Sequence, residues 1–595
     1  MVQWYGAFRP AIMGGRAMVS STHYLATAAG VEILKAGGNA VDAGVAVGLC
    51  INVLEPHLTN FGGVAPIMTW DATARRVETI SGLGRWPAAI SIDWYNQHFG
   101  GDMPEGIART VTPAAAAAWL DALARHGTMT FAQVVAPALA LAEGGFPVYP
   151  RLAATFANEA ATVAGWPASA ETFLPGGRAP REREIWRQPA LAATFRRLCE
   201  AERGAANREA GLEVARRRFY EGDMAEAMAR HSAAEGGLLT GDDLARFRVG
   251  HEAPVSTHYN EYEVFACGPW CQGPVIPQAL GILANDDLAA LGHNSADYLH
   301  LVAEALKLAF ADRERFYGDP DFVTVPLDGL LSPAYAAARR AQIDPARAWA
   351  ELPPSGDPRP FMSPNGRDLD VSARRPAAIT APPGPDTAYC CAVDAAGNAF
   401  SATPSDGALT GPLVPGLGIP LSTRGSQGWL DPAHPSAVAP NKRPRLTPNP
   451  ALALREGELF MPFGCPGGDG QTQAMLQVFL NVAAFGMNPQ RAIEEPRIIS
   501  ESFPDSFWPH GYAPGRLNVE GRIAPEVRAE LARRGHKVND WVDWHAAALL
   551  RLRDRGRSGD RHAHRRRGPA PRVLRARLLK FVKEQPIRPA RLFPQ

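Results

Sequence analysis

Apolar residues at helical spacing dominate the first part of the chain. Thr22 is placed to cap a helix over residues 24–34, and a helix of small residues is predicted from Asn39 to about residue 53, where Pro56 ends it. The same spacing predicts further helices over residues 114–123, 134–141, 296–316 and 473–485.

Short apolar runs on either side of a turn occur twice between these helices. Residues 65–70 and 77–80 form the first predicted hairpin. Residues 388–394 and 399–403 form the second around an Ala-Gly-Asn turn. Cys390 and Cys391 are neighbours in this second hairpin, so their side chains should lie on opposite faces of its sheet. The chain therefore combines helices with strands.

Thr387 stands at the start of the second hairpin, directly after Asp386. If the Asp386-Thr387 peptide bond were cut, Thr387 would carry a free α-amine with an ordinary pKa of about 7.7–8.0. Such an amine can act as the base for the hydroxyl of its own residue, which is a recognised way to activate threonine as a nucleophile. Most threonines at strand starts have no such role, so this segment alone is a weak indicator.

The stretch before Thr387, residues 353–385, is dense in proline, glycine and arginine and has no periodicity. This composition predicts an exposed linker. It is equally compatible with an accessible processing loop and with a plain connection between domains.

Composition places the chain among globular proteins with a large core. It has 595 residues, of which 46% are hydrophobic, and we expect one large unit or two interlocked ones. Residues 551–595 hold 13 Arg and 2 Lys against 2 Asp and 1 Glu, a net charge of +12, so the remainder of a chain with total charge +1 has −11. An acidic body gives no reason to expect nucleic-acid binding there.

The ends of the chain and its cysteines predict a location. Residues 1–10 lack the basic and apolar regions of a secretory signal, and no run of 18 apolar residues predicts a membrane span. The seven cysteines are odd in number and scattered, unlike a disulfide framework. Cys267 and Cys271 flank a turn without a second ligand pair, so we expect no metal or other cofactor. A reducing cytoplasm fits best.

Seven collinear segments resemble the gamma-glutamyltransferase family of N-terminal-nucleophile hydrolases, over nearly all of residues 15–540. They are residues 34–43 (LKAGGNAVDA), 53–56 (VLEP) with Gly62-Gly63, 303–313 (AEALKLAFADR) with 318–320 (GDP), Asp386-Thr387, 440–444 (PNKRP), 464–468 (GCPGG) and 494–497 (EEPR).

This resemblance implies an α+β fold of the αββα type, with two stacked sheets between helical layers. It also implies a precursor that cuts itself between Asp386 and Thr387 into a large subunit, 1–386, and a small subunit, 387–544. Thr387 would then attack a small-molecule amide, of gamma-glutamyl type as in glutathione, and form an acyl-enzyme. Water or an amine acceptor would release the acyl group.

Three more positions carry a catalytic role over from the family. Gly467 and Gly468 match the glycine pair whose backbone N–H groups form the oxyanion hole. Glycine lets the main chain approach the oxyanion closely, and one such donor is typically worth about 10²–10³ in rate. Ser405 matches a second threonine that hydrogen-bonds the nucleophile, and it keeps a hydroxyl at that place.

The positions that bind the acyl donor depart from the family pattern. The family's arginine for the donor α-carboxylate falls at Leu83, and its serine pair falls at Leu446 and Thr447. Its asparagine near the second threonine is replaced by Gly407. The glutamine and aspartate that hold the α-amino group fall near Arg424 and Gln427. Arg85 lies close enough to Leu83 to substitute for the missing arginine, and Thr447 retains one hydroxyl. The anionic anchor for an ammonium group is absent.

Two arginines therefore suggest an alternative substrate. A site with Arg85 and Arg424 suits a carboxylate better than a zwitterionic glutamyl group, as in an acylase for dicarboxylic acyl amides of the cephalosporin acylase kind. The competing interpretation is that both arginines are ordinary surface residues.

The C-terminal tail, residues 545–595, is rich in arginine where the family supplies closing strands. This composition is typical of a GC-rich gene translated out of frame, so we expect a frameshift. Missing strands would leave an open sheet edge and a thinner core. A third hypothesis follows, in which the chain is an inactive homologue that remains uncut.

Overall fold

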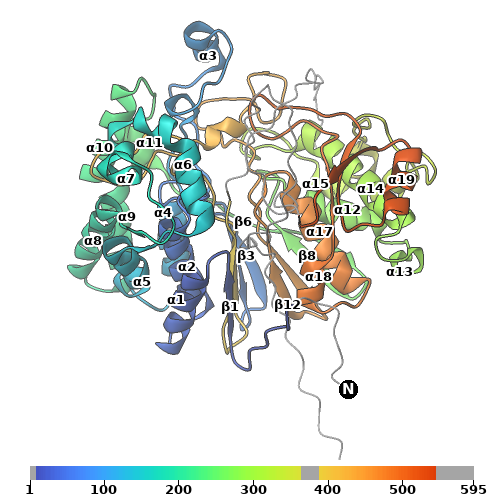
Figure 1. Ribbon diagram of the computed structural model, residues 1–595, viewed down its shortest axis with the longest axis horizontal. Helices are drawn as coiled ribbons and strands as arrows, with labels where there is room; N and C mark the ends of the chain where they lie inside the picture. The colour runs from blue at the N-terminus through green and yellow to red at the C-terminus, as the bar shows by residue number, and fades with distance from the viewer. Residues whose placement is uncertain (1–8, 363–386, 545–595) are drawn as a thin grey trace, which may run out of the picture.

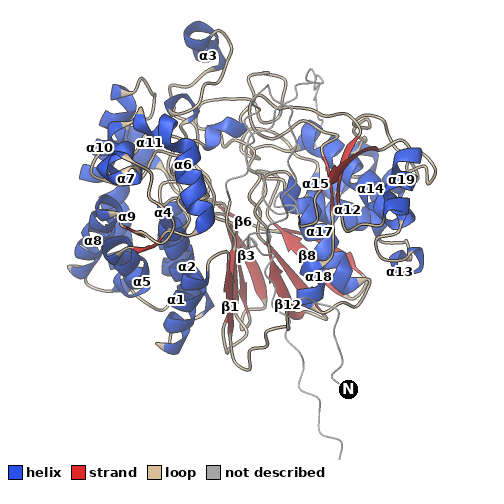
Figure 2. Ribbon diagram, viewed as in Figure 1, coloured by secondary structure: helices blue, strands red, loops and turns tan. Residues whose placement is uncertain are grey.

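A computed structural model describes residues 9–362 and 387–544. Two sheets stack in the middle of the molecule, and helices cover the outer face of each (Figures 1 and 2). Three apolar cores separate the layers: one lies between each sheet and its helices, and a smaller one lies between the two sheets. This is the four-layer αββα, α+β arrangement that the family resemblance implies.

The first sheet has six antiparallel strands and contains the second predicted hairpin. Its order is β1 (Met18–Ser21), β9 (Cys390–Val393), β10 (Ala399–Ala402), β2 (Ile67–Asp71), β3 (Arg76–Ile80) and β6 (His251–Glu252). In β9, Cys390 joins the core beneath the helices, while Cys391 packs with Tyr389 on the other side. The expected alternation of the two cysteines is confirmed.

The second sheet has four antiparallel strands. Its order is β12 (Glu458–Phe463), β11 (Ala451–Arg455), β8 (Tyr262–Ala266) and β7 (Val255–Tyr259). Strands from before residue 363 and after residue 386 thus sit side by side in both sheets.

The helical layer over the first sheet is built around a helix that is buried along its whole length, α2 (Ala40–Leu54). Its small residues are required by packing, since a Cβ on Gly44 would lie 2.1 Å from Cδ1 of Phe400 in β10. The other helices on this side are α1 (Tyr24–Lys35), α4 (Ala115–His126), α5 (Phe131–Gly144), α6 (Pro150–Ala164), α7 (Pro167–Phe173), α8 (Pro189–Arg203), α9 (Arg208–Tyr220), α10 (Asp223–Ala234) and α11 (Gly241–Arg246), while α3 (Ile92–Phe99) projects from the top in Figure 1.

The layer over the second sheet is centred on a long helix, α14 (Ala296–Phe316). The neighbouring helices are α12 (Val275–Leu283), α13 (Leu288–Leu291), α15 (Leu327–Leu330), α16 (Pro333–Arg340), α17 (Gly470–Ala483), α18 (Pro489–Glu494) and α19 (Pro525–Arg533). A small third sheet of β13 (Ile498–Ser500), β14 (Arg516–Glu520) and β15 (Lys537–Trp541) packs among them, with β14 and β15 parallel. Across the two described ranges, no helix combines the length and apolarity that crossing a bilayer requires.

The predicted helices and hairpins are present, with shifts of a few residues at their ends. One local prediction is wrong: Thr22 does not cap α1. His23 is the N-cap and accepts from the backbone N–H of Leu25, because the Thr22 hydroxyl donates instead to the buried carboxylate of Glu55. The linker before Thr387 and the arginine-rich tail lie outside the described residues.

Candidate active site

Thr387 is held by an extension of the β9–β10 hairpin. It forms an isolated antiparallel bridge with Ser405, and Ala388 N–H donates to the carbonyl of Pro404 at 2.9 Å. Ser405 N–H donates in turn to the carbonyl of Val64 next to β2, also at 2.9 Å. The main chain therefore fixes the positions of the Thr387 and Ser405 hydroxyls, and both side chains are buried.

The hydroxyl of Thr387 lies next to Ser405 and Gln471, and Ser405 is in turn contacted by Arg424. Thr387 Oγ1 lies 2.9 Å from Ser405 Oγ, and Nη2 of Arg424 donates to Ser405 Oγ at 2.8 Å. Gln471 Nε2, in the first turn of α17, lies 3.5 Å from Thr387 Oγ1. Arg424 is only 1% exposed, so the structure contradicts the interpretation of this arginine as a surface residue.

The segment before Arg424 is tied to the residue after Ser405. The carboxylate of Asp406 accepts from the Ser422 hydroxyl at 2.6 Å, the Thr423 hydroxyl at 2.9 Å and the Thr423 N–H at 3.1 Å. Asp406 has a φ of +82°, which a non-glycine residue adopts only under strong constraint. These contacts place Arg424 against Ser405.

Gly467 and Gly468 precede α17 and have φ values of +129° and +54°. Their carbonyls accept from the N–H groups of Gly470 and Gln471, at 2.9 and 3.2 Å. Within the described residues, the N–H groups of the two glycines donate to no protein atom. Because Gln471 reaches Thr387 from the first turn of α17, the positive end of this helix, which follows the glycine pair, lies near the nucleophile.

A buried network supports the glycine pair from behind. Gln272 donates to the carbonyls of Gly468 at 2.9 Å and Thr447 at 2.8 Å. Arg313 of α14 donates to Gln272 Oε1 and pairs with Asp469, the N-cap of α17. Sequence reasoning included Arg313 within a family motif but gave it no role, and it missed Gln272, Asp469 and Gln471, which only the fold brings together.

Thr447 belongs to the same network. Its hydroxyl accepts from Gln427 Nε2 at 2.8 Å, and its N–H donates to Gln427 Oε1 at 3.3 Å. The position where the family has an aspartate is thus occupied by a neutral amide whose two ends bind Thr447.

Arg85 lies elsewhere. It pairs with Asp321 at 2.6 Å and Asp319 at 3.3 Å and donates to the carbonyl of Asn441 at 3.0 Å. In the described part of the chain it makes no hydrogen bond with Thr387, Ser405 or Arg424. Two carboxylates already engage its guanidinium, so of the two proposed arginines only Arg424 is brought to the nucleophile. Asp386, on the other side of the predicted cut, lies outside the described residues.

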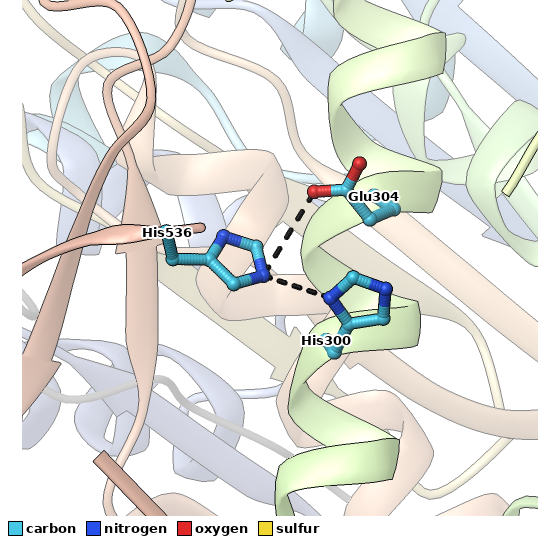
Figure 3. Close-up of side chains that lie close together, drawn as sticks. All are labelled: His300, Glu304 and His536. Carbon is cyan, nitrogen blue, oxygen red and sulfur yellow. Dashed lines mark hydrogen bonds and ion pairs between the residues drawn. The ribbon is translucent and has the colours of Figure 1, made fainter. Parts of the chain in front are cut away.

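One cluster away from this site has the residue types of a metal centre (Figure 3). His300 Nδ1 lies 2.9 Å from His536 Nε2, and that nitrogen lies 3.9 Å from Glu304 Oε1. However, Lys307 Nζ donates to the same Glu304 oxygen at 2.7 Å, and burial, with Lys307 nearby, lowers the pKa of His536 to about 2. A lysine ammonium occupies the place that a cation would need, so this is a hydrogen-bonded cluster.

Comparison with known proteins agrees with the fold and with this geometry. A family model described as Gamma-glutamyltranspeptidase matches residues 26–562. The chain is 32% identical over 530 residues to the Glutathione hydrolase-like YwrD proenzyme of Bacillus subtilis, covering 89% of this chain and 92% of that protein. It is 34% identical over 543 residues to the Acylase ACY 1 proenzyme of a Pseudomonas species, covering 88% of each. The solved structure of cephalosporin acylase from Bacillus halodurans superposes with a TM-score of 0.77 at 29% identity, covering 92% and 94% of the two chains.

The fold and these relatives define an enzyme of the N-terminal-nucleophile hydrolase class. Within that class, the chain belongs to the gamma-glutamyltranspeptidase family, as the sequence resemblance predicts. The expected gamma-glutamyltransferase-like amidohydrolase is therefore confirmed at the level of the family.

Proposed function

We propose that Thr387 forms the acyl-enzyme of a self-processing amidohydrolase that cleaves gamma-glutamyl amides. The observation that carries this proposal is a buried threonine hydroxyl with a hydroxyl partner 2.9 Å away, next to the N-terminal end of α17. At that end, the N–H groups of Gly467 and Gly468 donate to no protein atom of the described residues. A nucleophile, a partner for it and oxyanion donors are the minimal set for acyl transfer.

The reaction begins once the chain is cut before Thr387. The new α-amine takes the proton of Oγ1, which attacks the amide carbonyl of the substrate. The carbonyl oxygen becomes an oxyanion that accepts from the two glycine N–H groups. The amine leaves with the proton from the Thr387 ammonium, and an ester to Oγ1 remains. Water or an amine acceptor then attacks this ester by the same route.

We further propose that the cut yields subunits 1–386 and 387–544 with the tail, held together by the shared sheets. The chain's relatives are named as proenzymes, which supports a processed protein. The frameshift hypothesis for residues 545–595 and the hypothesis of an uncut, inactive homologue remain alternatives to it. The family match extends to residue 562, into this tail.

A second candidate is an acylase for dicarboxylic acyl amides, and Arg424 favours it. Its guanidinium is buried one hydrogen bond from Ser405, while Gln427 places a neutral amide where an ammonium group would need an anion. A buried cation stabilises a substrate carboxylate and repels a substrate ammonium. The relative named as an acylase is consistent with this reading.

The decisive experiment is a denaturing gel of purified wild type and Thr387→Ala. Wild type should give two fragments with a new N-terminus at Thr387, and Thr387→Ala should stay intact and inactive. Thr257→Ala, a change on strand β7, is the matched control and should be cut normally. An intact wild-type chain that still hydrolyses amides would refute the mechanism, while an intact and inactive wild type would support the inactive homologue.

Paired substrates separate the two acyl donors. Gamma-glutamyl and glutaryl anilides differ at the acyl end only by the α-ammonium group. A kcat/KM that is higher for the glutamyl compound supports the first proposal, and one that is higher for the glutaryl compound supports the acylase.

We also propose a reducing, cytoplasmic location. All seven cysteines are free thiols, and six of them are buried. Exclusively periplasmic recovery of the protein on fractionation of the source cells would contradict this location, and so would activity that is equal with and without a reductant in protein recovered there.

A further inference from the structure

Phe507, in the loop between β13 and β14, reaches two parts of the candidate active site at once. The guanidinium carbon of Arg424, the first residue of the 3-10 turn η4 (Arg424–Gln427), lies 5.4 Å from the centroid of the Phe507 ring. A Cβ added to Gly468 would lie 3.6 Å from Cε2 of the same ring, which is an ordinary van der Waals contact. One aromatic ring therefore lies next to both the buried cation and the glycine pair.

Hydrogen bonds on both sides of Phe507 hold its ring in this place. Before it, the N–H and the hydroxyl of Ser506 both donate to the carboxylate of Asp469, each at 2.7 Å. After it, the N–H of Trp508 donates to the carbonyl of Ser426 at 2.6 Å. Asp469 directly follows the glycine pair and Ser426 belongs to η4, so the loop is tied to the same two segments that the ring contacts. The side chain of Phe507 is buried.

An acyl group bound at this site would have the ring as a neighbour along its carbon chain. In the proposed reaction, its carbonyl oxygen accepts from the N–H groups of the glycine pair. A carboxylate at its other end would be stabilised by the positive charge of Arg424. Because Phe507 contacts both of these segments, its ring borders the path between them. A ring that is held on both sides is a rigid apolar surface, which packs well against a chain of one length and has no room for extra methylene groups.

We propose that Phe507 is the specificity-determining residue for the length of the acyl group. It forms the apolar wall of the acyl pocket and selects amides whose acyl group ends in a carboxylate and spans from the glycine pair to Arg424. The inference rests on the proposed function. It applies to both acyl donors considered there, because the glutamyl and glutaryl groups have the same carbon chain.

The experiment compares succinyl, glutaryl, adipyl and pimeloyl anilides, which increase by one methylene each, on the wild type and on Phe507→Ala. The wild type should prefer one anilide over the next longer one. Phe507→Ala opens space beside the chain, so the ratio of kcat/KM between these two anilides should fall at least about tenfold, since one methylene in an apolar pocket is typically worth about 10- to 200-fold. An unchanged ratio, or a wild type that turns over the pimeloyl compound best, would overturn the role of Phe507.

A matched control separates specificity from stability. Phe460→Ala, on β12, also removes a buried ring, which lies 4.8 Å from the ring of Tyr262 in the core beneath the helices of the second sheet. Both variants should lose stability in urea. Phe460→Ala should leave the ratio between the two anilides within about twofold, because a loss of stability lowers the amount of active enzyme for all substrates alike. An equal change of the ratio in both variants would show that it reports loosened packing and would overturn the proposal.

A second variant covers the case in which Phe507→Ala does not fold or is not cut. Phe507→Leu keeps an apolar side chain but shortens the wall, and it should lower the same ratio at least about threefold. If neither variant folds and cuts itself, the ring belongs to the framework of the fold, and its role in specificity is rejected.

The failure of this proposal can be distinguished from the failure of the proposed function. A wild type that neither cuts itself nor hydrolyses any anilide would refute the proposed function, and the role of Phe507 falls with it. A wild type that cuts itself but hydrolyses none of the dicarboxylic or gamma-glutamyl anilides would overturn the acyl pocket described here. An active wild type whose preference for length is the same in Phe507→Ala overturns the role of Phe507 alone.

Discussion

Two buried trios of polar side chains lie in different layers of this molecule, and they differ in what the charged side chain of each trio contacts. In the first trio, His300 and Glu304 of α14 meet His536, and a lysine ammonium and a backbone N–H satisfy both carboxylate oxygens of Glu304. In the trio at the nucleophile, Arg424 donates to Ser405 Oγ, which lies 2.9 Å from Thr387 Oγ1. The second trio therefore places a positive charge next to the hydroxyl partner of Thr387.

This difference shows why residue types alone do not identify a functional site. Two histidines and a glutamate within reach of one another are a common metal-binding set, yet Lys307 makes this set a closed structural cluster. Two hydroxyls and an arginine are an ordinary set of residue types, yet these three are buried together around the proposed nucleophile.

The largest effect should be a loss of stability when the carboxylate of Glu304 is removed from the trio with His300 and His536. Glu304→Gln leaves the Lys307 ammonium buried beside a neutral amide, since both side chains are only 1% exposed. Removing one partner of a buried ion pair typically costs about 3–5 kcal/mol. Urea denaturation should show this loss, while kcat of the folded enzyme stays within about twofold. The double variant Glu304→Leu/Lys307→Met should recover much of the stability, and a large loss of kcat in the folded variant would contradict a purely structural role.

The next largest effect should be a loss of kcat when the proposed oxyanion donors, Gly467 and Gly468, are changed. Gly467→Ala forces a side chain onto a φ of +129°, so the N–H groups should turn, and we expect kcat to fall about 10²–10³-fold. Gly468→Ala is the matched control, because its φ of +54° is tolerated better and its Cβ would meet Phe507 at an ordinary 3.6 Å. Steady-state kinetics on both variants test this order. Equal losses would mean that the glycines act by size and not by conformation.

A smaller effect is the loss of stability that should follow when the pH falls below 6.5. His434 and His510 both stack on Trp429, and burial lowers the pKa of His434 to about 3 and of His510 to about 4. Above pH 6.5 both are neutral whether folded or not. As the pH falls from 6.5 toward 4, the unfolded chain takes up protons first, so each histidine should remove about 1 kcal/mol of stability between pH 6.5 and 5.5 and at most about 1.4 kcal/mol per pH unit below that.

Urea unfolding followed by tryptophan fluorescence at pH 6.5 and 5.5 measures this loss. His434→Gln should lose about 1 kcal/mol less than wild type between these two pH values, because one titrating group is gone. An unchanged difference would mean that His434 does not carry the linkage.

The smallest effect should be that of zinc. Because Lys307 occupies Glu304 Oε1, we expect no change in the melting temperature of the wild type when zinc is added. Lys307→Met frees this oxygen beside two neutral imidazoles, so zinc should stabilise that variant. Stabilisation of the wild type by zinc would show that the trio binds metal despite the lysine.

Much of the fold could be predicted because its local signals agree with the family motifs. The long helix at 296–316 and both hairpins follow directly from apolar periodicity. The cap of α1 was predicted wrongly because the partner of Thr22 is Glu55, which is distant in sequence and reached only through the fold.

Site residues that belong to a sequence motif could be predicted, whereas those whose positions are set by packing could not. The motif positions Thr387 and Ser405 lie 2.9 Å apart through their hydroxyls, and Gly467 and Gly468 precede the helix from which Gln471 reaches Thr387. Arg85 and Arg424 looked equivalent in the sequence, but carboxylates close to Arg85 in space engage it, and only Arg424 is directed at the nucleophile. Such competition between partners has no local sequence signal.

The interleaving of strands from both sides of the predicted cut has a consequence for how the protein can be assembled. In the six-stranded sheet, β9 and β10 lie between β1 and β2, so neither fragment has a complete sheet of its own. An intact precursor refolds from denaturant as a single molecule, at a rate independent of its concentration. Once cut, the two pieces must first find each other, so recovery becomes second order and competes with aggregation through exposed strand edges. A single broken peptide bond would thus make folding a one-way step, and each enzyme molecule would depend on having assembled before it was cut.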